Sequence, residues 1–219
     1  MIWKKYSKHI NVNCPIDIVK LEKENKGVIE EMNSLAVFCG SSTGINNIYI
    51  DYARRFGKEL ADRNKTLIYG GAQVGCMGAL ADASLDNGGN VVGVIPQKLK
   101  DVEIAHHQLT ELYVVNTMHE RKSKMAALAD GFIALPGGSG TLEEWFEVFT
   151  WSQLGYHTKP CGLLNVNHFF DPLITMLDHT IEQGFMNKGY RDMIISASDP
   201  EELLEKMESY SPNYATKWT

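Results

Sequence analysis

Short apolar runs of strand length alternate with longer amphipathic stretches from residue 35 to residue 210, and this alternation constrains the fold more than any other feature. Apolar runs of four to six residues fit buried strands, whereas apolar residues three and four positions apart fit one face of a helix. Repeated strand–helix units place parallel strands between two layers of helices. The sequence therefore predicts an α/β fold, a three-layer sandwich in which a parallel sheet has helices on both faces, in a single domain covering residues 34–219.

The boundaries of the expected elements follow from glycines, prolines and polar residues that interrupt the apolar pattern. The predicted strands are residues 35–39, 66–69, 90–95, 111–115, 131–135, 161–165 and 193–196. The predicted helices are residues 47–63, 78–86, 118–129, 142–154, 170–183 and 200–210. A longer loop, residues 96–110, is expected between the third and fourth strands.

Three polar or glycine-rich loops follow predicted strands, at residues 40–44, 70–78 and 136–140. Ligands of open parallel sheets bind in the crevice at the carboxyl ends of the strands. We therefore expect these three distant segments to converge on one pocket.

The third of these loops is the most informative for function. Gly137, Gly138 and Gly140 allow backbone N–H groups to approach a ligand closely, and the positive end of the following helix suits a phosphate. Thr141 and Glu144 lie three residues apart, so they share a face of the first helical turn. A carboxylate beside a phosphate site fits an enzyme that cleaves a nucleotide.

The same residues also fit a purely structural interpretation. In a capping box, a threonine caps the helix and a glutamate three residues later reaches back to the backbone, as Thr141 and Glu144 would. The sequence alone leaves both interpretations open.

Positive charge is expected beside these loops. Arg121, Lys122 and Lys124 lie in a helix that opens directly after the fourth predicted strand. Arginine binds phosphate through a planar, bidentate fork. The alternative is a solvated helix face, which is a common role for such a charge run.

Other chemistries lack their usual signatures. The spacing of Gly71, Gly75 and Gly78 does not match a dinucleotide fingerprint, and no phosphate loop of the ATP-hydrolysing kind occurs. The adjacent His106 and His107 lack a third metal ligand at a known spacing, and Ser139 does not lie in a nucleophile elbow.

Composition limits the partners and the compartment. The net charge of −6 argues against general nucleic-acid binding, and no apolar run is long enough to span a membrane. The four cysteines are far apart, which is typical of reduced cysteines, and no signal-peptide core is evident. We therefore expect a cytoplasmic protein that binds neither nucleic acid nor membrane.

Residues 1–33 are polar and lack periodicity, so we expect an N-terminal extension that is disordered or loosely helical. A sharper hypothesis is that the native start is Met32. The segment from Lys26 to Met32 can be encoded by AAAGGAGTGATTGAAGAAATG, which places a bacterial ribosome-binding sequence before the ATG. Residues 1–31 would then be a leader that is not translated natively.

Two motifs carry a resemblance to a known family. Residues 136–144 read PGGSGTLEE and residues 118–122 read MHERK. These match the PGGxGTxxE and MHERK motifs of the LONELY GUY family, the cytokinin riboside 5′-monophosphate phosphoribohydrolases once mislabelled lysine decarboxylases. The resemblance covers about residues 34 to 210.

This resemblance implies an N-glycosidase. Family members hydrolyse adenosine-type 5′-monophosphates, including AMP in many bacteria, to a free base and ribose 5-phosphate. They have a Rossmann-like fold, need no metal or redox cofactor and commonly form homodimers. The catalytic pair falls on Arg121 and Glu144. The implied substrate-binding residues are Ser41, Glu103, Lys122, Gly138, Ser139, Gly140, Thr141, Leu142, Glu143 and Thr150.

Two other functions remain open at this point. A nucleotide or phosphate-ester carrier, similar to molybdenum-cofactor carriers, fits the same fold but does not need both Arg121 and Glu144. A pyridoxal-phosphate decarboxylase requires a lysine that forms a Schiff base, for which Lys122 and Lys124 are available. The aromatic residues Trp145, Phe146, Phe149 and Trp151 fit either the core or a dimer interface.

Overall fold

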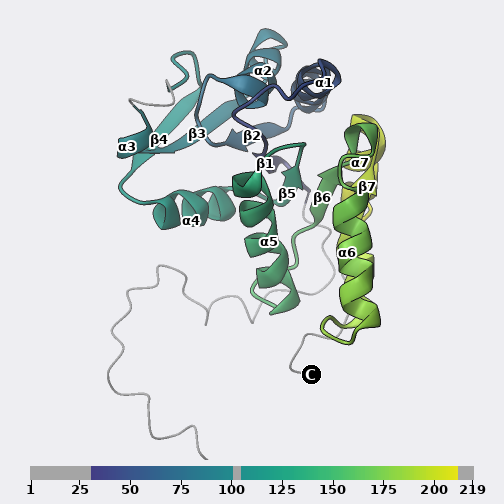
Figure 1. Cartoon of the computed structure of the whole chain (residues 1–219). Coiled ribbons are helices and arrows are strands. Elements are labelled where there is room, and N and C mark those ends of the chain that lie inside the picture. The colour runs from purple at the N-terminus through teal and green to yellow at the C-terminus, as the bar shows by residue number, and fades with distance from the viewer. Residues whose placement is uncertain (1–30, 101–104, 212–219) are drawn as a thin grey trace, which may run out of the picture. The chain divides into compact units, whose positions relative to one another are not determined.

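The computed structural model describes residues 31–100 and 105–211. Its centre is one parallel sheet of seven strands in the order β4-β3-β2-β1-β5-β6-β7 (Figure 1). This architecture confirms the predicted Rossmann-like α/β fold. The predicted extension lies outside the described residues except for its last three positions, and Glu103 lies outside them too.

The strands agree with the predicted ranges to within one residue at each end. They are β1 (Ser34–Phe38), β2 (Thr66–Tyr69), β3 (Val91–Pro96), β4 (Glu111–Val115), β5 (Gly131–Ala134), β6 (Cys161–Leu164) and β7 (Ile194–Ala197). The central strands are almost wholly buried because helices cover both faces, which explains their continuous apolar runs. β4 is an edge strand and is partly exposed.

The helices depart from prediction at three places that bear on the loops. They are α1 (Ile48–Asp62), α2 (Gly75–Asp86), α3 (Gln97–Lys100), α4 (Met118–Leu128), α5 (Ser139–Gln153), α6 (Asp171–Glu182) and α7 (Pro200–Glu208). Two 3₁₀ helices, η3 (Val166–His168) and η4 (Lys188–Met193), precede α6 and β7. The start of α2 lies inside the predicted loop 70–78, the short α3 lies in the predicted loop 96–110, and α5 starts three residues earlier than predicted.

Two apolar cores lie on opposite faces of the sheet. One packs α1, α2 and α7 against it, and the other packs α4, α5 and α6 (Figure 1). In the second core the rings of Trp145 and Phe149 stack with centroids 4.8 Å apart, and both residues are buried. Phe146 and Trp151 are only partly buried at its margin, so the core interpretation holds fully for two of the four aromatic residues.

In the part of the chain that the structure describes, no helix has the length and apolar character needed to cross a bilayer.

Candidate active site

The positive end of α5 opens at the carboxyl end of the sheet. α5 begins directly after β5, with Gly138 at its N-cap and no side chain capping the helix. Gly138, Ser139 and Gly140 are all exposed. The first backbone N–H groups of a helix have no partner inside the helix, so this terminus suits an anionic group.

The capping-box interpretation of Thr141 and Glu144 is wrong. Thr141 is the third residue of α5 and is buried, so it does not cap the helix. A threonine caps α4 instead: Thr117 Oγ1 accepts a hydrogen bond from Glu120 N at 3.1 Å, in an arrangement similar to a capping box. The Glu120 carboxylate in turn accepts one from Asn116 N at 2.9 Å. The threonine–glutamate spacing that signals it was present in the sequence, and it fixes where α4 begins.

The glycines of the loop differ in the space around them. A Cβ added at Gly137 would lie 2.2 Å from Thr141 Oγ1 and 2.8 Å from Gly40 N, so this glycine is required by packing. A Cβ added at Gly138 or Gly140 would meet no atom of the described residues within 4 Å. Neither has a positive φ. The protein itself therefore does not require glycine at these two positions, which fits a ligand that approaches the backbone.

Substituting these two glycines is expected to weaken substrate binding without unfolding the protein. In Gly138→Ala and Gly140→Ala, the methyl group would occupy the space of the substrate phosphate, so KM should rise about tenfold, equivalent to about 1.4 kcal/mol of binding. Gly140→Ala should keep the melting temperature, since alanine is a better helix former than glycine. Gly138→Ala should lower it only slightly, because alanine is a poorer N-cap residue than glycine. Gly137→Ala is the steric control and should lower the melting temperature. Unchanged KM values in both variants would contradict a phosphate site here.

Three loops converge next to this helix terminus, as predicted. Gly40 N donates a hydrogen bond to Pro136 O at 3.2 Å, which joins the loops that follow β1 and β5. Gly75, with φ +60°, packs so tightly on the first loop that an added Cβ would lie 2.3 Å from Ser41 C. β1 and β5 are neighbours in the sheet, and their connections lead to opposite halves of it, which is the topological position where open parallel sheets bind ligands.

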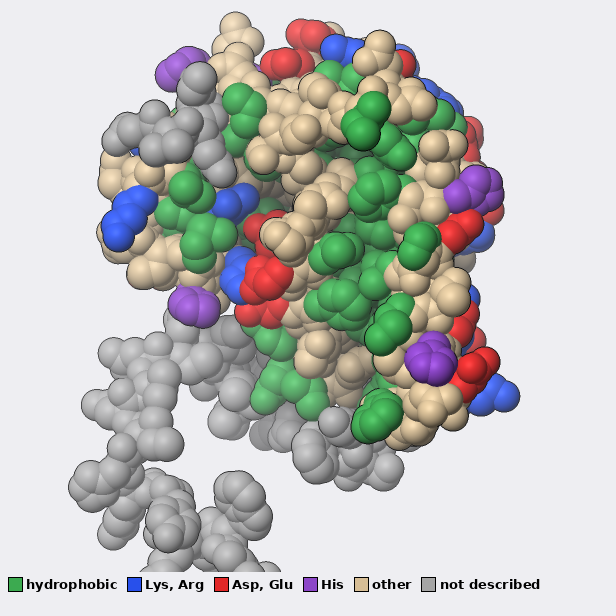
Figure 2. All heavy atoms as spheres, in the orientation of Figure 1, with side chains coloured by type: hydrophobic (Ala, Val, Ile, Leu, Met, Phe, Trp, Pro, Cys, Tyr) green, Lys and Arg blue, Asp and Glu red, His purple; other side chains and the backbone are tan. Residues whose placement is uncertain are grey.

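Arg121 and Glu144 meet beside these loops, next to Gly70 and the start of α5. Arg121 Nη2 lies 3.7 Å from Glu144 Oε1, and the two side chains are only 8% and 11% exposed. Figure 2 shows basic and acidic side chains gathered where α4 adjoins α5. The structure thus brings together the two residues that the sequence assigned to catalysis.

Burial dominates the electrostatics of this pair. It raises the pKa of Glu144, and the nearby Arg121 guanidinium offsets part of that rise. Arg121 Nε is buried and has no hydrogen-bond partner among the described residues. A buried donor without a partner is costly, so this N–H group suits a bound anion or sugar oxygen.

Sequence reasoning missed two residues that shape the pair. A Cβ added at Gly70, the residue after β2, would lie 2.1 Å from Arg121 Nη2, so the guanidinium rests directly on this backbone. The Gly70-Gly71 pair after a strand was the available signal. Cys39 is buried and interacts electrostatically with both members of the pair; its thiol pKa is raised by burial, by Cys76 and by Glu144. This thiol therefore stays protonated.

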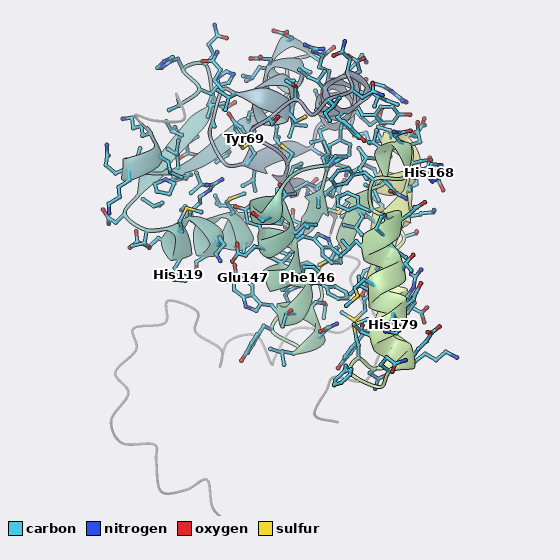
Figure 3. All side chains as sticks on the ribbon, viewed as in Figure 1. Tyr69, His119, Phe146, Glu147, His168 and His179 are labelled. Atoms are coloured by element: carbon cyan, nitrogen blue, oxygen red, sulfur yellow. The ribbon has the colours of Figure 1, made fainter. Side chains whose placement is uncertain are left out.

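Lys122 and Glu143 pair with each other. The Lys122 ammonium hydrogen-bonds the Glu143 carboxylate and lies 3.1 Å from Glu147 Oε2. Glu147 lies on the side of α5 that faces α4 (Figure 3). Sequence reasoning did not single out Glu147, because nothing in the sequence shows which α5 residues meet α4.

The other predicted binding residues differ in their surroundings. Ser41 is exposed on the loop after β1 and Ser139 is exposed at the first position of α5, whereas Leu142 packs against the second core. Thr150 is exposed and lies nine residues beyond Thr141, which is about 13 Å along the helix axis. The structure does not bring Thr150 to the helix terminus. Within residues 31–100 and 105–211, no three His, Cys, Asp or Glu side chains are grouped to hold a metal ion.

Comparison with known sequences places this geometry in a family context. The profile of a family described as "possible lysine decarboxylase" matches residues 77–207. A probable cytokinin riboside 5′-monophosphate phosphoribohydrolase of Oryza sativa subsp. japonica is 49% identical over 180 residues, covering 82% of this chain and 74% of that protein. A cytokinin riboside 5′-monophosphate phosphoribohydrolase of Rhodococcoides fascians is 49% identical over 177 residues, covering 80% and 89%.

Solved structures share the fold at low identity. The molybdenum cofactor binding protein of Rippkaea orientalis aligns with a TM-score of 0.62 and 20% identity, covering 82% of this chain and 98% of that one. The molybdenum cofactor carrier protein of Chlamydomonas reinhardtii aligns with a TM-score of 0.59 and 18% identity, covering 80% and 94%. These similarities establish a shared fold only.

Proposed function

Because this chain belongs to the LONELY GUY family of cytokinin riboside 5′-monophosphate phosphoribohydrolases and is an N-glycosidase of nucleoside monophosphates, we propose that it hydrolyses AMP, cytokinin riboside 5′-monophosphate or both, with Arg121 and Glu144 as its catalytic residues. The observation that carries this proposal is the buried Arg121–Glu144 pair beside the uncapped N-terminus of α5. The products would be the free base and ribose 5-phosphate.

The 5′-phosphate is assigned to the N-terminus of α5. Its N–H groups, the open space at Gly138 and Gly140 and the nearby Arg121 guanidinium together favour an anion there. The phosphate is remote from the bond that breaks. Its binding energy would therefore orient the ribose relative to Glu144, which accelerates the reaction.

Glu144 is assigned to the reacting centre. In the reaction the bond between ribose C1′ and the base nitrogen breaks, and its electron pair leaves with the base. Positive charge then develops on the ribose until water adds to C1′. A carboxylate held in a buried site stabilises this charge more strongly than one in water, and it can accept the proton of the attacking water.

A decarboxylase that uses pyridoxal phosphate is disfavoured by the state of Lys122. A Schiff base requires a neutral amine before it forms. Burial lowers the pKa of Lys122, but hydrogen bonds to Glu143 and Glu147 outweigh this effect and raise the pKa. Lys124 lies with Nζ 4.0 Å from the centre of the Tyr113 ring, on the edge strand β4.

We also propose a homodimer in the cytoplasm. Phe146 and Trp151 are partly buried at the margin of the second core, so they are available to a second copy. Cys39, Cys76 and Cys161 are free and buried, which fits a reducing compartment.

An assay of base release tests the proposed activity. Purified protein should release adenine and ribose 5-phosphate from AMP, or the prenylated base from isopentenyladenosine monophosphate, as followed by chromatography. Adenosine lacks the phosphate that orients the ribose, so its kcat/KM should be lower by about 10³-fold or more. If only the prenylated substrate reacts, AMP is excluded as a substrate. If no 5′-monophosphate reacts, the proposal fails.

A further inference from the structure

α5 carries three carboxylates within its first nine residues, and among the described residues only one of them pairs with Arg121. Glu143 and Glu147 are four residues apart, and Glu144 and Glu147 are three apart, so the three are neighbours on the helix surface. Like charges at these spacings repel one another. Glu144 is the most buried of the three, with its side chain 11% exposed against 57% for Glu143 and 25% for Glu147.

Lys122 forms ion pairs with the other two carboxylates. Its side chain is 10% exposed, and its ammonium group contacts Glu143 Oε1 and Glu147 Oε2. Arg121 and Lys122 are consecutive in α4, so their side chains leave the helix about 100° apart. Arg121 therefore meets Glu144, whereas Lys122 meets Glu143 and Glu147. Figure 3 shows Glu147 between the two helices.

We infer that Lys122 is a positioning residue for Glu144, which holds Glu143 and Glu147 in ion pairs away from the reacting carboxylate and secures α5 against α4. This inference rests on the proposed role of Glu144. It differs from the substrate contact that the family resemblance implies for Lys122. A phosphate could reach this ammonium only by displacing a carboxylate that already neutralises it.

The charged groups around Glu144 determine how the loss of Lys122 would change the pKa of Glu144. Arg121 and Lys122, both from α4, lower the pKa of Glu144, whereas Glu143 and Glu147 on α5 raise it. The Cys39 thiol from the β1 end is neutral. Without Lys122, two unpaired carboxylates would remain beside Glu144, and its pKa would rise further because like charge disfavours the ionised form.

The test compares Lys122→Met with Lys122→Met/Glu147→Gln, which removes the more buried of the two freed carboxylates. Lys122→Met should move the acidic limb of the kcat profile to higher pH and lower kcat at pH 6 about tenfold relative to pH 8. KM should change less than about threefold. The double variant should recover most of the loss, and Lys122→Arg should resemble the wild type. Lys58→Met, which removes an exposed lysine paired with Asp62 on α1, is the matched control.

The carboxyl ¹³C signal of Glu144, followed against pH without substrate, gives a second readout that does not depend on activity. This signal should titrate at higher pH in Lys122→Met than in the wild type. In the double variant its titration should return to about the wild-type pH. A rise of tenfold or more in KM with an unmoved acidic limb would assign Lys122 to the substrate and overturn the inference. A lower melting temperature with an unmoved titration would overturn it too. If the wild type released no base, the proposed function would fail, while the ¹³C titration would still decide the charge relation.

Discussion

Glu144→Gln is expected to lower kcat for base release by about 10³-fold or more, because the amide keeps the shape of the side chain but lacks the negative charge that stabilises the developing cation. KM should change little, since the phosphate is held by α5 and Arg121. Steady-state rates at saturating substrate measure the effect. A Glu144→Gln enzyme that keeps more than about a tenth of the wild-type kcat would exclude Glu144 as the catalytic carboxylate.

The same variant should not be less stable at neutral pH. Burial raises the pKa of Glu144 in the folded protein, so above that pKa the ionised carboxylate destabilises the folded state relative to the unfolded one. This destabilisation disappears as the pH falls and the carboxyl binds a proton. The melting temperature of Glu144→Gln should therefore equal or exceed that of the wild type at pH 7, and the two should converge at acidic pH. A wild type that is clearly more stable at pH 7 would contradict this account.

The raised pKa also predicts how activity depends on pH. If the ionised form of Glu144 is the active one, kcat should fall on the acidic side at a pH above the usual range for glutamate. Loss of the Arg121 guanidinium would move that limb further upward, since it lowers the Glu144 pKa. The position of the acidic limb therefore reports on the pair and not on Glu144 alone.

The bounds of single elements, and the placing of residues along them, were predictable from the sequence. The bounds of β2 and β4 match the predicted ranges, because both strands are apolar runs ended by glycine or polar residues. The spacing of Thr141 and Glu144 correctly placed a carboxylate near the start of α5. The start of α5 was predicted three residues late because Ser139 and Gly140 are weak helix formers. Both residues nevertheless lie in the first turn of α5.

Contacts between elements were not predictable in the same way. Whether Lys122 meets a substrate or Glu147 depends on how α4 packs against α5, and one sequence holds no signal for that packing. The same holds for Gly70, whose contact with Arg121 joins β2 to α4. Residue types therefore indicated a phosphate site, while the partners of each charge emerged only from the fold.

Gly70→Ala is expected to abolish most of the activity with little effect on folding. The added methyl group would lie 2.1 Å from Arg121 Nη2, and its next neighbours would be Arg121 Cζ and Met77 Sδ. All three atoms belong to flexible side chains, so the arginine can move aside without a shift of the backbone. Moving Arg121 away from Glu144 by about 1 Å is enough to lower the rate by about 100-fold.

A matched pair of glycine variants separates this effect from damage to the fold. In Gly75→Ala the methyl group would lie 2.3 Å from the backbone C and O atoms of Ser41, at a residue with φ +60°. Because backbone cannot yield as a side chain does, Gly75→Ala should lower both the melting temperature and the activity. Gly189→Ala, where the added Cβ has only Asn187 Oδ1 nearby at 3.5 Å, should change neither. If Gly70→Ala retained full activity, the position of Arg121 against the end of β2 would not matter for catalysis. If it unfolded like Gly75→Ala, the arginine would have to be fixed more rigidly than its surroundings suggest.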